Sequence, residues 1–389
     1  NSGWLHSIDR IDDICFCIRH NKDTDRIVCE ELIDLFRKEK KLIHIGDKVI
    51  GANNPILVQS MNNTKTSDIK GTLEQIYQMY DAGCDITRVA IPDMDSAIAL
   101  KEISKKSPIP VVADIHFDYK LAIASATYGA SKIRINPGNI GGFDRVKEVA
   151  NCCKERNIPI RVGVNSGSIE KRLLEKYKGV CKEAMVESAL SSVRMLEDAN
   201  FDDIVISIKS SDVALTIDTY RLLSEKCNYP LHVGVTEAGT LREGVIKSSV
   251  GIGTLLSEGI GDTIRVSLTG DCVDEVRTGV SILRSLGLRK GGITFVSCPT
   301  CGRTRVPLIE VATTIEKAVC DLPYNLKIAV MGCAVNGPGE ASDADIGVAG
   351  GDGDFILFEK GKIIRKISSE NLVREFVEEV KRLGEENRA

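Results

Sequence analysis

The stretch that decides the fold is Thr87–Arg88–Val89–Ala90, a short run of strand-forming residues with an arginine inside it. The same pattern returns in Ile133–Arg134–Ile135–Asn136, Ile160–Arg161–Val162–Gly163 and Ile264–Arg265–Val266–Ser267. Amphipathic, helix-like segments separate these copies along the chain. Short β-branched runs that alternate with helical periodicity predict a repeated strand–helix unit.

This strand–helix rhythm begins near residue 55 and continues to residue 286. Apolar runs predict strands at residues 56–61, 86–91, 111–115, 133–135, 160–164, 204–208, 231–235 and 263–268. Amphipathic patterns predict helices at residues 72–80, 97–104, 121–128, 146–154, 182–198, 214–224, 241–257 and 273–286. Eight such units over roughly 230 residues favour an α/β fold, a (β/α)8 TIM-type barrel. A doubly wound open sheet is the alternative, and the lack of Gly-x-Gly-x-x-Gly after the first strand weakens it.

A smaller domain is predicted after the barrel. Arg289–Lys290–Gly291–Gly292 has the composition of a linker. Strands are expected at residues 293–297, 326–331, 345–349, 355–358 and 362–367, and helices at 308–321 and 371–383. The chain is therefore divided into an extension of unknown role at 1–40, the barrel at 41–288, and an α+β domain at 289–389.

Composition excludes several classes of protein. The 389 residues carry 51 Lys and Arg against 55 Asp and Glu, and this net charge of −4 argues against a general nucleic-acid binder. Thirteen cysteines, an odd number scattered over a long chain, exclude a small secreted disulfide scaffold. The N-terminal region has no signal-peptide core, and no apolar run reaches 18 residues. We therefore expect a cytoplasmic protein with no membrane helix.

The repeated arginines stand where apolar side chains normally fill a barrel interior. Lys209 ends the sixth predicted strand and adds a fifth cation to Arg88, Arg134, Arg161 and Arg265. Because the carboxyl ends of barrel strands open on one mouth, we expect these cations to converge there. Arginine and lysine in such a cluster favour a phosphate ester or a diphosphate. The alternative is that each arginine pairs with a buried carboxylate of the barrel.

Further polar residues stand at the same predicted strand ends. They are Gln59, Ser60, Asp114, His116, Asn136, Asn165, Glu237 and Ser267. His116 or Glu237 could transfer protons. A lone histidine is more often a structural hydrogen-bonding group, and so Glu237 is the preferred candidate.

The small domain contains three cysteines and a carboxylate in a pattern typical of metal sites. Cys298 and Cys301 form a C-x-x-C motif, Cys333 lies in a glycine-flanked turn after a predicted strand, and Glu340 follows on a Gly-Pro-Gly turn. C-x-x-C alone fits a redox dithiol, half a zinc site or half a cluster site. Zinc lacks a fourth ligand, since Cys320 is expected in the core. An iron–sulfur cluster accepts three thiolates and a replaceable oxygen ligand, although spacing alone slightly favours Glu340 as a solvated carboxylate.

Long motifs in both domains resemble one enzyme family. They are VVADIHFD (111–118), RINPGN (134–139), RVGVN (161–165), TEAG (236–239), LSEGIGDT (256–263), CPTC (298–301) and CAVNGPGE (333–340). Their order and sequence resemble the 4-hydroxy-3-methylbut-2-en-1-yl diphosphate synthase family, from about Lys41 to the C-terminus. These are iron–sulfur oxidoreductases of the methylerythritol phosphate route to isoprenoids. The resemblance implies reductive ring opening and dehydration of 2-C-methyl-D-erythritol 2,4-cyclodiphosphate, with electrons from flavodoxin or ferredoxin.

The resemblance also implies roles for individual residues. It places a [4Fe–4S] cluster on Cys298, Cys301, Cys333 and Glu340. It assigns phosphate binding and other pocket contacts to Arg88, Asp114, Arg134, Asn136, Arg161, Asn165, Lys209, Arg265 and Ser267. Glu340 would be a catalytic ligand that the substrate hydroxyl displaces, and Glu237 the candidate proton donor.

The family further implies a homodimer in which one subunit's cluster domain closes over the partner's barrel. The short link before Cys298 indicates the compact bacterial form, and residues 1–40 have no counterpart in the family. Two other classes remain open from the residues themselves: a different cluster-dependent reductase, and a non-enzymatic iron–sulfur sensor. A sensor has no need of five cations in a barrel mouth.

Overall fold

The computed structural model describes Arg37 and residues 39–387. The chain divides into two compact units, with the boundary between Arg289 and Lys290. Most of the extension predicted at residues 1–40 lies outside the described residues, together with Cys15, Cys17 and Cys29. Each unit is considered by itself below.

The first unit is a barrel of eight parallel strands in the order β8-β7-β6-β5-β4-β3-β10-β9. A parallel bridge between Ile206 and Leu231 brings β8 beside β9 and nearly closes the ring. The strands are β3 (Leu57–Met61), β4 (Ile86–Ala90), β5 (Val111–Asp114), β6 (Lys132–Ile135), β7 (Ile160–Asn165), β8 (Ile204–Lys209), β9 (His232–Val233) and β10 (Thr263–Ile264). The predicted TIM-type barrel is confirmed.

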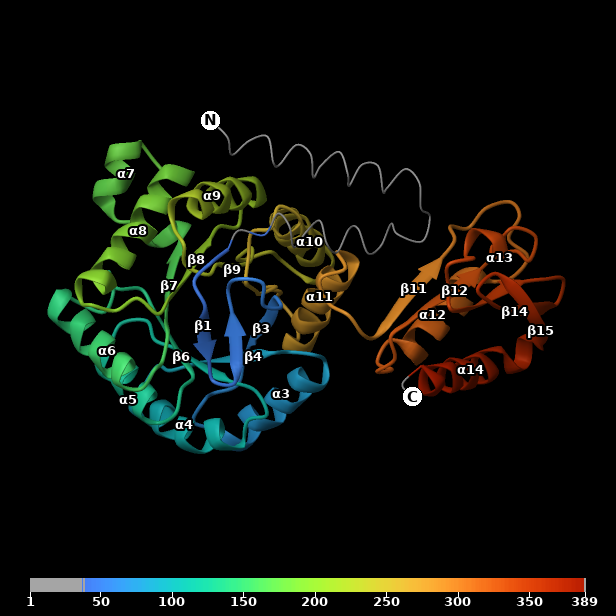
Figure 1. Ribbon diagram of the computed structural model, residues 1–389, viewed down its shortest axis with the longest axis horizontal. Coiled ribbons are helices and arrows are strands. Elements are labelled where there is room, and N and C mark those ends of the chain that lie inside the picture. Colours follow the sequence, from blue (N-terminus) through green and yellow to red (C-terminus); the bar gives the residue numbers. More distant parts are fainter. Residues whose placement is uncertain (1–36, 38, 388–389) are drawn as a thin grey trace, which may run out of the picture. The chain divides into compact units, whose positions relative to one another are not determined.

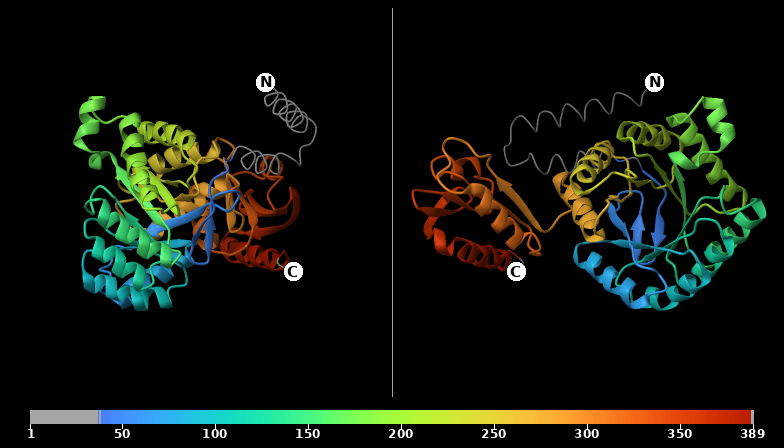
Figure 2. Two further views of the ribbon diagram at one scale, coloured as in Figure 1. Left: turned by 60° about the vertical axis from the view of Figure 1, so that its left-hand side comes forward. Right: turned by 180° about the vertical axis from the view of Figure 1, so that it is seen from behind.

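Helices surround the ring of strands (Figures 1 and 2). They are α3 (Ile69–Asp81), α4 (Met94–Lys106), α5 (Tyr119–Thr127), α6 (Phe143–Glu155), α8 (Lys182–Asp198), α9 (Val213–Lys226), α10 (Leu241–Ser257) and α11 (Cys272–Ser285). Several begin at an aspartate whose side chain accepts a hydrogen bond from a backbone N–H of the first turn, as Asp68, Asp93 and Asp212 do. Such N-caps fix where each loop ends and the helix begins. A further short helix, α7 (Lys171–Tyr177), was not predicted.

An antiparallel hairpin of β1 (Ile43–Ile45) and β2 (Lys48–Ile50), also not predicted, precedes the barrel. Its isoleucines form an apolar cluster with residues at the beginnings of the barrel strands. The cluster consists of Ile43, Ile45, Ile50, Leu57, Ile86, Val112 and Val205. Because Leu57 and Ile86 begin β3 and β4, the hairpin covers the amino-terminal end of the barrel interior.

The described end of the extension is bound to this same end of the barrel. Lys40 is buried and donates hydrogen bonds to the carbonyls of Ser224 and Cys227. Arg37 pairs with the buried Asp262 at 3.3 Å. The barrel unit therefore includes residues that precede the predicted boundary at residue 41.

The second unit is built on a mixed sheet in the order β11-β12-β13-β14-β15. Its strands are β11 (Ile293–Ser297), β12 (Leu326–Met331), β13 (Ile346–Gly350), β14 (Asp354–Glu359) and β15 (Lys362–Ser368). The first three are parallel, and β13, β14 and β15 pair antiparallel. Helices α12 (Leu308–Val319) and α14 (Leu372–Glu386) bury Ile315 and Phe376 in its core. The predicted α+β domain is confirmed.

Two local predictions were wrong. Cys320 was expected in the core, but it caps the C-terminus of α12 and is exposed, because it lies on the same face of the helix as the exposed Glu316 and Lys317. The eighth strand was expected to run to residue 268, but β10 ends at Ile264. Arg265 and Ser267 therefore lie on the irregular segment that follows the strand.

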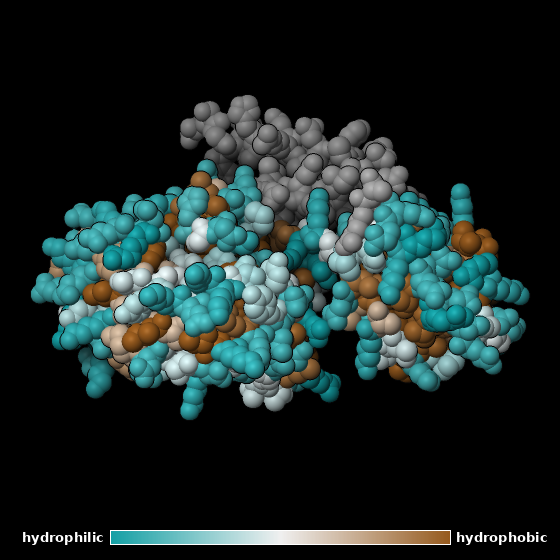
Figure 3. Space-filling model, turned by 90° about the horizontal axis from the view of Figure 1, so that it is seen from below, coloured by the Kyte–Doolittle hydropathy of each residue, from teal (hydrophilic) through white to brown (hydrophobic). Residues whose placement is uncertain are grey.

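No helix in the described ranges is both long enough and apolar enough to cross a membrane. The face drawn in Figure 3 is mainly hydrophilic, with hydrophobic side chains in separate groups.

The hairpin yields a prediction about stability. Ile45 is fully buried, so Ile45→Ala should leave a cavity and lower the melting temperature by about 5 °C or more in thermal unfolding followed by circular dichroism. Leu42→Ala, at an exposed residue beside the same hairpin, is the matched control. Equal melting temperatures for the two variants would contradict the structural role of the hairpin.

Candidate active site

Side chains alternate along a strand, so the residues flanking each repeated arginine pack outward against the helices and the arginine faces inward. Val89 and Ile133 accordingly belong to the main apolar core between strands and helices. Arg88 and Arg161 are buried, as is Lys209, and Arg161 is only 1% exposed. The barrel interior is therefore strongly polar, and its charged residues come from several strands.

Asp114, at the end of β5, binds two of these arginines. Its Oδ1 atom lies 3.2 Å from Nη1 of Arg134, and its Oδ2 atom lies 3.8 Å from Nε of Arg88 and 3.6 Å from Nε2 of His116. Burial alone would raise the pKa of Asp114, but Arg88, the hydrogen bond with His116, and Arg134 hold that pKa well below its usual range. Asp114 is thus a fixed negative charge that orients two cations, and His116 lies beside it.

A second carboxylate, Glu275 of α11, was missed in the sequence. Its Oε1 atom lies 3.5 Å from Nη2 of Arg265, and its carboxylate also accepts hydrogen bonds from Ser60 Oγ and from the Leu268 backbone N–H. Glu275 is buried. One feature of the sequence could have revealed Glu275: it is a glutamate on the apolar face of a predicted helix, next to Val276 and four residues before Gly279.

Arg161 and Lys209 form no ion pair with a carboxylate in the described part of the chain, and several nitrogens of the cluster have no hydrogen-bond partner there. Arg161 Nε and Nη1, Lys209 Nζ and Arg265 Nε are buried without a hydrogen-bond partner among the described residues. Arg88 donates from Nε and Nη2 to the thioether sulfur of Met61, which is a weak acceptor. Burial and neighbouring cations lower the pKa values of Arg161 and Lys209. Only some of the arginines therefore have a carboxylate partner, and the alternative in which every arginine is paired within the barrel does not hold. A bound anion would neutralise the cations that are left without a partner.

Two glycines leave room for these side chains. A Cβ atom at Gly163 would lie 2.6 Å from Nε of Arg134. One at Gly234 would lie 2.3 Å from the carbonyl oxygen of Arg265 and 3.0 Å from Nζ of Lys209. The backbone is thus shaped to the cations, and any larger residue at either position would displace one of them.

The other predicted pocket residues lie at or just beyond the carboxyl ends of the strands, and they differ in how far they are buried. Asn136 is buried and its Oδ1 accepts a hydrogen bond from the Gly138 N–H, which leaves its amide group as a donor. Asn165 is exposed at the end of β7, and Ser267 is half-buried beyond β10. Glu237 is exposed after β9 with a φ of 52°, in the left-handed region that non-glycine residues rarely adopt. Such strain is concentrated at functional sites.

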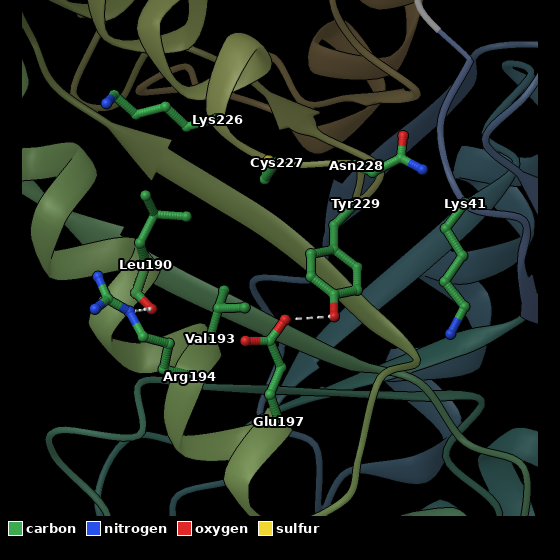
Figure 4. A pocket seen from close by; sticks show the side chains of 9 residues that line it. All are labelled: Lys41, Leu190, Val193, Arg194, Glu197, Lys226, Cys227, Asn228 and Tyr229. Carbon is green, nitrogen blue, oxygen red and sulfur yellow. Dashed lines mark hydrogen bonds between the residues drawn. The ribbon is translucent and has the colours of Figure 1, made fainter.

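One hollow of the barrel unit lies elsewhere. It has a volume of about 630 Å³ and lies between α8 and the loop that precedes β9 (Figure 4). Its polar groups have partners: Tyr229 donates to Glu197, and Lys41 pairs with Asp202 at 2.7 Å. Asp202 precedes β8, so the hollow is near the amino-terminal ends of the strands. Barrel active sites form at the other end, and we assign this hollow no role.

The three cysteines lie on loops that follow adjacent strands of the second unit. Cys298 follows β11 directly and Cys333 follows β12, its parallel neighbour. The Gly332 N–H donates to Cys298 Sγ at 3.1 Å. Glu340 was expected on a turn, but it ends a four-residue helix, α13 (Gly337–Glu340), and is exposed.

Arg303 links the candidate ligands electrostatically. A hydrogen bond from its backbone N–H, and then its guanidinium, lower the pKa of the exposed Cys301 thiol, which favours the thiolate. The charges of Cys301, Glu340 and Cys333 in turn raise the pKa of Arg303. No three His, Cys, Asp or Glu side chains among the residues that the structure describes lie close enough to hold a metal ion. Three sulfurs and one oxygen on neighbouring loops nevertheless fit an iron–sulfur cluster in their chemistry.

A TIM barrel whose inward cations are only partly paired, followed by a unit with three cysteines and a glutamate on loops, is typical of a two-domain enzyme that acts on an anionic substrate. Family comparisons agree with this class. A model described as "GcpE TIM-barrel domain" matches residues 40–280, and one described as "GcpE protein C-terminal domain" matches residues 294–382.

Curated relatives match over nearly their whole lengths. Proteins named 4-hydroxy-3-methylbut-2-en-1-yl diphosphate synthase (flavodoxin) are 62% identical in Ruminiclostridium cellulolyticum and 59% identical in Clostridium acetobutylicum. Each alignment covers 88% of this chain, and 98% and 99% of the respective relatives. A third, from Caldanaerobacter subterraneus, is 58% identical over 90% of this chain and 99% of its own length. The chain belongs to the 4-hydroxy-3-methylbut-2-en-1-yl diphosphate synthase family.

The fit between Gly163 and Arg134 can be tested. Gly163→Ala should push the Arg134 guanidinium out of place and weaken binding of inorganic pyrophosphate about tenfold, measured by titration calorimetry. Gly253→Ala, in α10 with nothing near the added methyl group, is the control and should bind normally. Unchanged affinity in a folded Gly163→Ala variant would show that the Arg134 position does not matter for anions.

Proposed function

We propose that this chain catalyses the reductive ring opening of 2-C-methyl-D-erythritol 2,4-cyclodiphosphate to (E)-4-hydroxy-3-methylbut-2-enyl diphosphate. One carbon–oxygen bond to the diphosphate breaks, the neighbouring hydroxyl leaves as water, and two electrons form the new carbon–carbon double bond. Two protons are consumed when the substrate and the product are both counted in their fully protonated forms. The observation that carries this proposal is the set of buried, unpaired cations in the barrel, which suits a diphosphate.

The barrel residues bind and orient the diphosphate. Arg161 offers Nε and Nη1, and Lys209 offers Nζ, all buried and without partners within the described chain. Arg134 and Arg88 are held by Asp114 on one side of the interior, and Arg265 by Glu275 on another. Charge-assisted hydrogen bonds from these groups fix the substrate at its phosphates. The carbon skeleton is thereby left at the mouth, where the reaction occurs.

Cys298, Cys301, Cys333 and Glu340 are the residues that would hold a [4Fe–4S] cluster. Such a cluster supplies the two electrons of the reduction one at a time when it is bound. The carboxylate of Glu340 is exposed and is the hard, replaceable member of the ligand set. Asn336 Nδ2 lies 3.5 Å from Glu340 Oε1 and limits the directions in which that carboxylate can point.

Glu237 is the proposed proton donor to the departing oxygen. Its φ of 52° holds the backbone in a strained conformation at the barrel mouth, just before Gly239. An exposed carboxyl group at this position can deliver a proton to a substrate bound at the mouth. Asn136, Asn165 and Ser267 are proposed to hydrogen-bond the substrate around the same mouth.

The partners of the enzyme follow from the same proposal. A flavodoxin would supply the electrons, as the names of the relatives indicate, and a ferredoxin is the alternative donor. The chain is proposed to work as a homodimer in the cytoplasm, where reducing conditions keep ligand thiols available. Gly291 and Gly292 directly follow the unit boundary, both at positive φ, which glycine adopts without strain.

The activity has a direct test. Protein prepared without oxygen should contain about four irons per chain and convert the cyclodiphosphate to the linear diphosphate with dithionite and a viologen dye as reductant. Cys333→Ser should lose the iron and the activity, whereas Cys320→Ser should keep both, because Cys320 lies outside the proposed ligand set. A colourless protein that holds zinc, or an iron-loaded protein without turnover, would contradict the proposal.

The role of Glu237 has a separate test. Glu237→Gln removes the proton but keeps the size of the side chain, so kcat should fall by about 100-fold or more while KM changes little. Glu243→Gln, on the nearby first turn of α10, is the control and should retain the activity. A Glu237→Gln variant with normal kcat would assign proton delivery to another group.

A further inference from the structure

The outer strand of the second unit has a surface that is both apolar and basic, and the proposed function gives it no role so far. β15 is an edge strand of the five-stranded sheet: β14 pairs with it on one side, and no strand of the described chain pairs on the other. Ile363 and Ile364 on this strand are 61% and 52% exposed. Residues 360–366 have the sequence KGKIIRK, with four basic side chains and no acidic one. We call residues 360–366 the basic edge.

Three lysines of the basic edge keep their charge free for a partner. Lys360, Lys362 and Lys366 are exposed and form no ion pair with any residue that the structure describes. Arg365 differs, because it pairs with two glutamates of α14. Lysines on an edge strand usually protect it from pairing with another chain. Two neighbouring exposed isoleucines have the opposite effect, so protection does not account for the whole segment.

The basic edge touches the loop that carries two of the proposed cluster ligands. Lys360 and Gly361 form the turn between β14 and β15. A Cβ atom at Gly361 would lie 3.2 Å from the carbonyl oxygen of Pro338. Pro338 belongs to α13, which lies beside this turn (Figure 1), and it stands two residues before Glu340 and five after Cys333. A protein bound to the basic edge would therefore lie next to the proposed cluster.

The strand register places an isoleucine of the basic edge on the same side of the sheet as α13. Ile363 is paired with Phe358 across the β14–β15 ladder, and directly paired residues share a face. Phe358 is buried in the apolar cluster that includes Ala341, the residue after Glu340. The apolar part of the basic edge and the ligand loop are thus on one face, whereas α14 covers the other.

The proposed reaction needs a protein that delivers electrons, and the donor proposed above is a flavodoxin. Flavodoxins are small, acidic proteins that pass electrons singly. Electron-transfer complexes have small interfaces, and charge attraction between the partners guides their encounter. Three unpaired lysines around two exposed isoleucines match an acidic carrier in charge and supply a small apolar centre for the contact.

We propose that the basic edge is the docking surface for the electron carrier, an acidic flavodoxin. This inference rests on the proposed function, because it takes the second unit as the acceptor of the electrons. Each bound carrier gives one electron to the cluster and leaves oxidised by one electron, so two carriers in turn supply the two electrons of one turnover. The substrate has to reach Glu340 itself. Docking beside this ligand, on the turn next to α13, leaves it open to the substrate.

Direct binding tests the docking surface without turnover. Calorimetric titration of the iron-loaded protein with oxidised flavodoxin from Clostridium acetobutylicum, at low ionic strength, gives the Kd. The double variant Lys360→Glu, Lys362→Glu should bind about tenfold or more weakly, because two attractions become repulsions. The double variant Lys317→Glu, Lys381→Glu makes the same change of net charge at exposed residues of α12 and α14. This control should change the Kd by less than about threefold. Added salt should weaken binding more in the unaltered protein than in the first variant.

Activity with two reductants separates docking from chemistry. With dithionite and a viologen dye, which need no docking surface, Lys360→Glu, Lys362→Glu should keep its iron and its normal rate. With reduced flavodoxin as the donor, the KM for flavodoxin should rise about tenfold.

Unchanged affinity for flavodoxin in this variant, or equal losses of rate with both reductants, would overturn the proposal. A changed molecular mass in solution would also overturn it, since the basic edge would then be a contact between copies of this chain. If the unaltered protein is inactive with the dye, the proposed reaction fails, and the binding titration still decides whether flavodoxin docks at the basic edge.

Discussion

The interior of this barrel is organised by an excess of positive charge that the described chain does not neutralise. Six basic side chains face inward, and two carboxylates, Asp114 and Glu275, face them. Unpaired buried charge is costly, so the rest of the barrel must hold these groups against their mutual repulsion. The apolar hairpin cluster below them and the apolar layer between strands and helices provide that rigidity.

The same constraint explains the local departures from a regular barrel. Gly163 and Gly234 lack side chains because Arg134 and Lys209 occupy that space. β9 and β10 are only two residues long, and Gly234 and Arg265, which directly follow them, approach each other closely. Glu275 accepts hydrogen bonds from Ser60 and the Leu268 N–H, and Asp114 accepts one from Arg134, so both carboxylates are held in place beside the cations that they bind.

The fold was predictable from sequence because it depends on periodicity, and the strand–helix alternation marked all eight units. The hairpin at residues 43–50 was not predictable, since its two strands are three residues long and their pairing depends on contacts with the barrel floor. The arginines of the site could be found because a charged residue inside an apolar strand is conspicuous. Lys132, the sixth of the inward cations, was not predicted as a site residue, because it is the first residue of its strand and resembles an ordinary surface lysine. Glu275 was not predicted either, because helices contain many glutamates. Long-range pairing cannot be inferred from local pattern alone.

The central claim is that the unpaired inward cations hold a diphosphate. A crystal structure of the protein with the cyclodiphosphate tests it most directly. Phosphate oxygens are expected about 2.7–2.9 Å from Nε or Nη1 of Arg161 and from Nζ of Lys209. Diphosphate bound elsewhere, with these nitrogens hydrogen-bonded only to water or to protein carboxylates, would contradict it.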